Sequence, residues 1–336
     1  MASESNRKLS ILYTLKVLQD YTDDEHYLTQ TEIAQKIEQL YGMSCERKSI
    51  SFNIKSLQDF GYEIIELKRK GVYLAQRTLE PSEISFVVDA MFSSKSINGK
   101  QAKDISQKVY NLLSVYQRKK FNYVYKADEI SRANNKQLFY NIDIINEAIE
   151  KNKQIIFNYN RYDIDGNLVS RKEGKTYLVN PYFLVNSQGR YYLVCNYDYF
   201  DDLANYKVEQ ITNIKLVDNE IKPITKLKSY ENGLDISKYT NEHIYMLEGK
   251  TINAKIKLGS QFEVNYIYDW FGKNAKVYCE NDIYYADITA NENAIKYWCM
   301  QYGDCVELVA PQEMRNEIIK LLNNMTTKYR GVKNGK

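Results

Sequence analysis

The sequence has few of the residues from which catalytic and metal sites are usually built. Only two of its 336 residues are histidines, His26 and His243, and neither lies in a nucleophile or carboxylate pattern. The five cysteines are odd in number and never spaced as C-x-x-C: Cys45, Cys195, Cys279, Cys299 and Cys305. Free thiols in a reducing cytoplasm are therefore expected, and a zinc site is not.

Long apolar runs and the signature motifs of enzymes are also missing. No stretch approaches the roughly 20 apolar residues that cross a membrane, and no signal peptide opens the chain. The chain has no G-x-S-x-G, Walker loop, H-E-x-x-H or dinucleotide fingerprint. We therefore expect a cytoplasmic protein that is not an enzyme, with no cofactor, no metal and no membrane partner.

Positive charge is scarce overall, because the net charge is only +3, but it is unevenly distributed. Residues 1–43 carry four cations against seven carboxylates, whereas residues 44–78 carry seven cations against four carboxylates. Tyrosine is abundant, with 31 residues against four prolines, and this excess is typical of half-buried strands and wet pockets. The distribution of charge therefore draws attention to residues 44–78.

Two amphipathic helices in succession are predicted on either side of Gly42. Before the first, Thr29 and Glu32 have the spacing of a capping box, and Gly42 ends the helix. The second helix ends at Gly61 and has two contrasting faces. Its apolar face consists of Ile50, Ile54 and Leu57, and its opposite face consists of Lys48, Ser51, Phe52 and Lys55.

A basic hairpin is predicted directly after these helices. Residues 64–67 and 72–74 form short strand patterns around the tip Lys68-Arg69-Lys70-Gly71. Helix, turn, helix and basic hairpin predict a winged helix-turn-helix that binds double-stranded DNA, because the second helix fits the major groove and the tip reaches phosphates. Two amphipathic helices alone would also fit a helical bundle with a solvated basic face. The expected DNA-binding residues are Arg47, Lys48, Ser49, Ser51, Phe52, Lys55, Lys68, Arg69 and Lys70.

The rest of the chain divides by its hydrophobic period. Residues 79–150 have helical patterns and predict a connecting linker, in which the basic residues 118–120 are expected to be a solvated helix end. Residues 151–225 predict short strands at 155–159, 176–180, 182–186, 190–194 and 206–211, hence a small SH3/Sm-like antiparallel β-barrel. Residues 245–330 have the β-α-β-β-α-β order of a ferredoxin-like domain. With the winged helix-turn-helix at residues 1–78, the expected fold is multidomain α+β.

In this combination the chain resembles the WYL-domain transcriptional regulators of bacteria along nearly its whole length. The likeness depends on the order of four short motifs. These are Lys48-Ser49-Ile50 on the second helix, Asn180-Pro181-Tyr182 followed by Gly189-Arg190-Tyr191-Tyr192-Leu193, the strand Tyr206-Lys207-Val208-Glu209-Gln210-Ile211, and Trp298-Cys299 before Gly303, Val306 and Pro311. The last motif is similar to the C-terminal extension that the family calls WCX.

The resemblance implies a ligand-responsive regulator, expected to be a repressor, that binds operator DNA as a homodimer. It also implies a barrel pocket for an anionic effector, either nucleotide-like or a single-stranded nucleic acid. The candidate effector-binding residues are Arg171, Asn180, Arg190, Tyr192, Lys207 and Gln210. Cations that lie close together repel one another unless an anion or a carboxylate neutralises them. We expect the effector to neutralise these residues.

The chain departs from the family pattern at several of these positions. Tyr191 replaces the tryptophan of the family name, Phe52 replaces an arginine of related recognition helices, and Lys207 and Gln210 replace two arginines. The last two changes remove planar forks that would hold phosphate at two points. Solvated positions on barrel strands would show the same pattern as a pocket. The alternative function is an accessory RNA- or protein-binding module of a nucleic-acid defence or processing machine.

Overall fold

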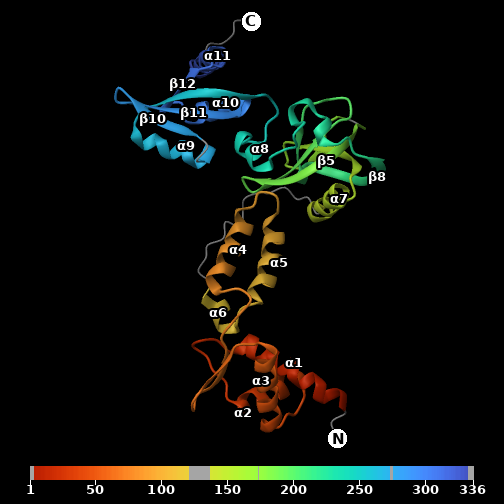
Figure 1. Cartoon of the computed structure of the whole chain (residues 1–336). Helices are drawn as coiled ribbons and strands as arrows, with labels where there is room; N and C mark the ends of the chain where they lie inside the picture. Colours follow the sequence, from red (N-terminus) through yellow and green to blue (C-terminus); the bar gives the residue numbers. More distant parts are fainter. Residues whose placement is uncertain (1–3, 121–136, 173, 273–274, 332–336) are drawn as a thin grey trace. The chain divides into compact units, whose positions relative to one another are not determined.

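The computed structural model describes residues 4–120, 137–172, 174–272 and 275–331. The chain forms two compact units, with the division between Arg132 and Ala133 (Figure 1). In the described part of the chain, no helix combines the length and the apolar character that crossing a membrane requires.

The first unit begins with three helices and a hairpin, α1 (Glu4–Tyr21), α2 (Gln30–Tyr41), α3 (Arg47–Phe60), β1 (Ile64–Leu67) and β2 (Gly71–Leu74). The predicted capping box is present, since the Thr29 amide donates to Glu32 Oε2 at 2.7 Å. Gly42 and Gly61 end the two helices in the left-handed conformation. The core is apolar and includes Ile33, Ile37, Ile50, Ile54 and Leu57. The expected arrangement, like that of a winged helix-turn-helix, is confirmed.

The second strand of the hairpin is fixed, next to the tip, to the segment just before α2. The amide of Leu28 donates to the carbonyl of Val72 at 3.1 Å, and the amide of Val72 donates back to Leu28 at 2.8 Å. Gly71 has φ +125°, and a Cβ there would lie 2.5 Å from the Leu28 carbonyl oxygen. This position therefore needs glycine both for its conformation and for the close approach of the two backbones.

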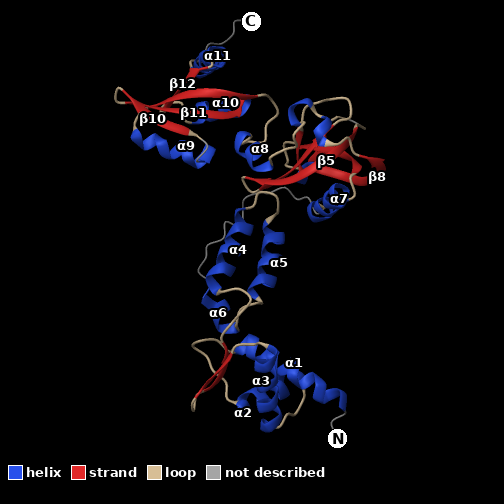
Figure 2. Ribbon diagram, in the orientation of Figure 1, coloured by secondary structure: helices blue, strands red, loops and turns tan. Residues whose placement is uncertain are grey.

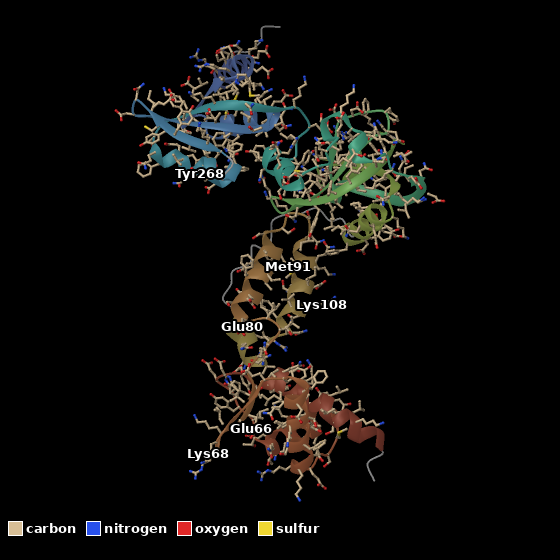
Figure 3. The ribbon with its side chains drawn as sticks, in the orientation of Figure 1. Glu66, Lys68, Glu80, Met91, Lys108 and Tyr268 are labelled. Atoms are coloured by element: carbon tan, nitrogen blue, oxygen red, sulfur yellow. The ribbon has the colours of Figure 1, made fainter. Side chains whose placement is uncertain are left out.

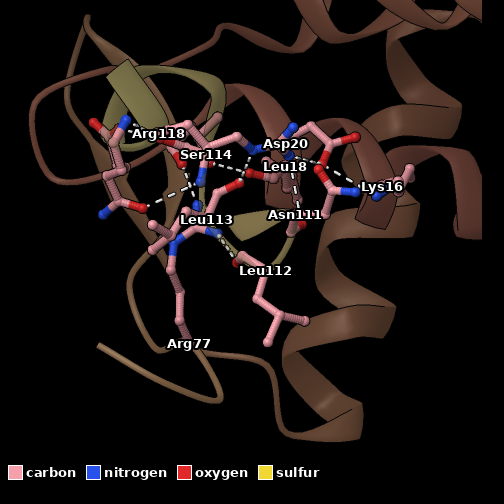
Figure 4. A network of polar contacts seen from close by, with 12 residues as sticks. Lys16, Leu18, Asp20, Arg77, Asn111, Leu112, Leu113, Ser114 and Arg118 are labelled. Carbon is pink, nitrogen blue, oxygen red and sulfur yellow. Dashed lines mark hydrogen bonds and ion pairs between the residues drawn. The ribbon is translucent and has the colours of Figure 1, made fainter. Parts of the chain in front are cut away.

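Three further helices complete the described part of this unit, α4 (Pro81–Ser93), α5 (Gly99–Tyr110) and α6 (Val115–Lys120). Figure 4 shows the polar network that joins them to the three-helix domain. Arg77 donates from Nη2 to the Thr22 carbonyl at 2.5 Å and from Nη1 to the Leu112 carbonyl at 3.2 Å. Arg118 donates to Asp20 at 3.4 Å, so this member of the basic cluster is a structural contact.

Asp23 is the buried centre of the same network. Its Oδ2 accepts a hydrogen bond from Ser114 Oγ at 2.6 Å, and its Oδ1 lies 2.6 Å from His26 Nδ1. Burial alone would raise the pKa of Asp23, but the bonds from Ser114, His26 and the Glu25 amide hold it below its usual value. The expectation that His26 has no carboxylate near it is therefore wrong, because the loop folds back on itself.

The second unit begins with α7 (Leu138–Glu150) and an antiparallel sheet. The strands are β3 (Lys153–Tyr162), β4 (Leu168–Ser170), β5 (Thr176–Ser187), β6 (Arg190–Asn196), β7 (Ala204–Lys207) and β8 (Ile211–Glu220). Their order is β4-β3-β5-β6-β7, and β8 also pairs with β3. No ladder joins β7 to β8 within the described residues, so the sheet is a curled half-barrel where a closed barrel was expected. Phe157, Tyr159, Tyr177 and Tyr206 pack their rings together in it.

Three details of this unit differ from the sequence-based expectation. The strands expected on either side of Pro181 are one strand, β5, with an irregular register between Pro181 and Phe183, where the missing N–H is tolerated. The strand expected at 206–211 is interrupted by a 3₁₀ turn, η2 (Val208–Gln210). Helix α7, assigned to the linker, packs on the sheet, and Asn141 Nδ2 donates to the Ile211 carbonyl at 2.9 Å.

The C-terminal part follows three short helices, η3 (Ile224–Lys226), η4 (Lys228–Tyr230) and α8 (Ile236–Glu242). The predicted β-α-β-β-α-β order is present in β9 (Thr251–Leu258), α9 (Val264–Phe271), β10 (Lys276–Glu280), β11 (Ile283–Asn291), α10 (Glu292–Gln301) and β12 (Val306–Ala310) (Figure 2). The strands are antiparallel in the order β10-β11-β9-β12. Trp298 is fully buried in their core. The last helix, α11 (Gln312–Tyr329), exposes Ile319, Leu322, Met325 and Tyr329.

Candidate functional site

Helix α3 has a packed face and an exposed basic face. Ile50, Ile54 and Leu57 are buried, and Asn53 Nδ2 donates to Ser10 Oγ at 2.7 Å and to Thr14 Oγ1 at 3.0 Å of α1. The residues of this helix that were predicted to contact DNA are all exposed: Arg47, Lys48, Ser49, Ser51, Phe52 and Lys55. The Asn53 contacts were not predicted, because periodicity alone does not identify a buried polar partner on another helix.

The hairpin tip carries the other predicted DNA contacts. Lys68, Arg69 and Lys70 are exposed, and Figure 3 shows the Lys68 side chain extending away from the hairpin. Within the described residues, no carboxylate forms an ion pair with these three cations or with Lys48 and Lys55. Lys70 Nζ lies 6.0 Å from the centre of the Tyr27 ring. The five cations thus have no carboxylate partner among the described residues, and their charges can bind phosphate. Arg47 is held differently, because its Nε donates to Gln30 Oε1 at 3.2 Å.

Five of the six predicted effector-binding residues lie around Tyr159 of β3. The Tyr159 hydroxyl donates to Gln210 Oε1 at 2.7 Å and accepts from the Lys207 amide at 3.3 Å. The Arg171 amide donates to the Tyr159 carbonyl at 3.3 Å. Tyr192 on β6 is paired with Lys207 on β7, and Arg190 lies two residues before it. We call Arg171, Arg190, Tyr192, Lys207 and Gln210 the cation cluster.

Arg190 has an internal partner that the sequence analysis missed. Its guanidinium forms an ion pair with Glu209, a fully buried carboxylate on η2. Burial raises the pKa of Tyr159 to about 12, and the Glu209 carboxylate adds to this shift while Arg171 opposes it. The repulsion that an anionic effector was expected to relieve is therefore already reduced inside the protein, where Glu209 neutralises Arg190. Glu209 belongs to the motif at residues 206–211, which the sequence analysis singled out. Its pairing with Arg190 was not predicted because it depends on the 3₁₀ turn η2.

Asn180 does not belong to the cation cluster. It is fully buried, where its Nδ2 donates to Asp198 at 2.8 Å and its Oδ1 accepts from Gln154 Nε2 at 2.9 Å. In the ladder of β5 and β6, Asn180 faces Asn196 while Ser187 faces Arg190. Seven strand residues separate the two positions, which corresponds to roughly 23 Å. The expectation that Asn180 shares the site is corrected accordingly.

Two of the solved structures that match this chain have informative titles. Proteasome accessory factor B/C (PafBC) of Arthrobacter aurescens has 13% sequence identity and a TM-score of 0.30 over 95% of this chain and 48% of its own. This chain thus spans about half the length of that protein. A CRISPR Cas-related protein has 17% identity and a TM-score of 0.40 over 98% of this chain and 86% of its own. A comparison with curated proteins gave no match.

The family is assigned by a domain match that covers the sheet. The family model of the WYL domain matches residues 140–216, from helix α7 into strand β8. This range contains all six of the residues that were expected to bind an effector. Residues 140–216 are therefore a WYL domain.

Proposed function

We propose that the protein is a transcriptional regulator that binds specific double-stranded operator DNA through α3 and the hairpin. The observation that carries this proposal is a set of exposed cations without carboxylate partners, on the face of α3 opposite its core and on the hairpin tip. Such cations bind phosphates by releasing counterions, and α3 has the exposed side chains to contact base edges. Residues 1–78 are the proposed winged helix-turn-helix DNA-binding domain.

We also propose a role for each of the other parts of the chain, given a DNA-binding N-terminal domain. Residues 79–150 form the linker, apart from α7, and residues 151–225 form an SH3/Sm-like sensor. Residues 245–330 form a WCX-like, ferredoxin-fold domain. Two copies of the chain form a homodimer, and the exposed Ile319, Leu322 and Met325 of α11 supply an apolar surface for it. Two copies would double the DNA contacts and select palindromic operators.

An anionic effector, nucleotide-like or single-stranded nucleic acid, is proposed to bind at the cation cluster. Arg171 is exposed and Lys207 is half-buried, whereas Arg190 is held by Glu209. The anion would therefore contact Arg171 and Lys207 first. Reciprocity requires that operator DNA and effector change each other's affinity by the same factor.

The proposal is tested by titrating the full chain with fluorescent genomic duplexes at several salt concentrations. Binding to a subset of duplexes, with affinity that falls steeply with salt, is the expected result. Preference for RNA or for single strands over every duplex would favour the accessory-module alternative and overturn the operator proposal.

The effector site needs a separate experiment with a matched pair of variants. Arg171→Ala with Lys207→Ala removes two cations of the cation cluster and keeps the Arg190–Glu209 ion pair, so operator binding should remain while the response to nucleotides and short oligonucleotides is lost. Asn180→Ala is a poor control because it is buried, so the exposed Lys172→Ala serves instead. An unchanged response in the double variant would contradict the proposed effector site.

A further inference from the structure

A second site lies at the opposite end of β6 from Arg190. A cavity of about 1150 Å³ is enclosed by the β6–β7 connection, the segment around α8, and the start of α10. Arg190 and Asn196 are the two ends of β6, and their six steps correspond to roughly 20 Å. The cavity is therefore distant from Arg190, although Ala204 in its lining begins the strand β7 that ends at Lys207. It is large enough for a small-molecule ligand.

The walls of this cavity combine acidic and aromatic groups. Five carboxylates and only two lysines line it; the carboxylates are Asp202, Asp235, Glu242, Glu248 and Glu292. Tyr197, Phe200, Tyr230 and Tyr239 provide ring surface. Carboxylates with aromatic faces attract organic cations, whereas an anionic ligand would meet an excess of like charge.

Three of the carboxylates act on tyrosine hydroxyl groups of the cavity wall. Burial raises the pKa of Tyr230, and the charges of Asp202 and Glu242 raise it further. Burial likewise raises the pKa of Tyr239, to which the Glu248 charge contributes. These carboxylates therefore converge on one region although they come from different segments of the chain.

Some of these carboxylates already have partners, and two do not. Asp235 caps α8 by accepting the Lys238 amide at 3.0 Å, and Glu242 lies 3.8 Å from Lys238 Nζ. Glu292 Oε1 accepts the Lys250 amide at 3.4 Å. Asp202 and Glu248 are exposed, and neither carboxylate has a hydrogen bond or ion pair within the described part of the chain.

His243 supplies an independent indication of a ligand. Its side chain lines the cavity although the residue is only 6% exposed. Nδ1 lies 2.9 Å from the Tyr239 carbonyl, which can only accept, so Nδ1 carries the proton of the neutral ring. Burial lowers the pKa of His243 and favours this neutral form. Nε2 is then a lone-pair acceptor without a protein partner among the described residues.

We propose that this cavity binds an aliphatic polyamine, with its ammonium groups on Asp202 and Glu248 and a hydrogen bond to His243 Nε2. A metal ion fits less well, because within the described residues no three His, Cys, Asp or Glu side chains gather closely enough to hold one. Carboxylates spread along an aromatic wall suit an elongated cation with several charges. This site is independent of the proposed DNA and effector surfaces.

Calorimetric titration of the full chain with spermidine tests the proposal. One spermidine per chain should bind, and Asp202→Asn with Glu248→Gln should weaken binding at least about tenfold, because charge-assisted hydrogen bonds are lost. Both side chains are exposed and have no partner among the described residues, so the double variant should keep its melting temperature. Glu220→Gln, an exposed carboxylate outside the cavity, is the matched control and should bind as the parent does.

Two comparisons decide the outcome. The uncharged 1,8-octanediol should not bind, since it has the length of the ligand without its charge. Equal binding of spermidine to the double variant and the parent, an equal loss in Glu220→Gln, or equal binding of the diol would each overturn the proposal.

Discussion

Lys68, Arg69 and Lys70 at the hairpin tip have no carboxylate partner among the described residues, whereas Arg190 on β6 is paired with the fully buried Glu209. The first group loses little by meeting an anion, because its charges are solvated and free to bind phosphate. Arg190 must instead keep Glu209 neutralised, since a buried carboxylate without a partner is strongly unfavourable. Similar side chains are thus left without a carboxylate partner in one unit and form part of the folded structure in the other.

This difference changes how the WYL motif should be interpreted in this chain. Arg190, a basic residue of the family motif, was expected to bind an anionic effector. The ion pair shows that it already binds an anionic group of the protein, the Glu209 carboxylate. Arg171 and Lys207 remain as the cations of the cluster that can bind an effector without removing that pair.

The largest expected effect comes from breaking the Arg190–Glu209 pair. Arg190→Ala should lower the free energy of unfolding of the second unit by about 3 kcal/mol, because the buried Glu209 carboxylate loses its ion pair with Arg190. Replacing both residues, Arg190→Met with Glu209→Leu, should restore most of the stability. Urea denaturation measures both, and Lys68→Ala is the control that should leave stability unchanged. If Arg190→Ala is as stable as the parent, Arg190 does not stabilise the fold, and the difference argued between the two units is wrong.

The second largest effect is expected on DNA binding when the hairpin cations are removed. Changing Lys68, Arg69 and Lys70 together to alanine should weaken binding to every DNA sequence and lower the salt dependence by up to about 3 units of slope. The unfolding free energy should stay the same, since none of the three has an ion-pair partner among the described residues. Binding measured by anisotropy between low and high salt checks this. An unchanged slope would exclude the tip from the DNA interface.

A smaller effect on stability is expected at Gly71, where the second strand of the same hairpin leaves the tip. Gly71→Ala places a Cβ 2.5 Å from the Leu28 carbonyl oxygen at φ +125°, so it should destabilise the first unit by about 1–3 kcal/mol. Gly42→Ala is a useful control, because its φ is also positive but no atom lies within 4 Å of the added Cβ. If thermal unfolding shows that the two variants lose equal stability, the close contact contributes nothing beyond backbone strain.

Phe52→Ala should have the smallest effect, and it should change specificity with little change in stability. The side chain is 72% exposed, so packing contributes little, and loss of a contact with a thymine methyl would cost on the order of 1 kcal/mol at one base pair. Competition between operators that differ at single positions measures this preference. A lower melting temperature with unchanged preference would show that Phe52 packs on the protein instead.

Local signals in the sequence were sufficient for the first unit and for the C-terminal domain. The capping residues Thr29 and Glu32, the stop at Gly42 and the start of α10 at Asn291 act within a few residues, so their patterns predict structure directly. The open edge of the sheet, the bulge at Pro181 and the packing of α7 depend on which distant strands meet. Periodicity carries no information about which distant strands pair. For the same reason the sequence did not predict the pairing of Glu209 with Arg190 or the contact of Asn180 with Asp198.

The anchoring of the hairpin at Gly71 has a consequence for how this protein can diverge. Because the two hydrogen bonds to Leu28 hold the strand that follows the tip, the charge of residues 68–70 can change without disturbing the three-helix core. In the proposed role, descendants of this chain could therefore strengthen or weaken their binding to DNA phosphates by altering residues 68–70 alone. Selection for a different affinity would then act on a short segment whose mutations carry little risk of unfolding the domain.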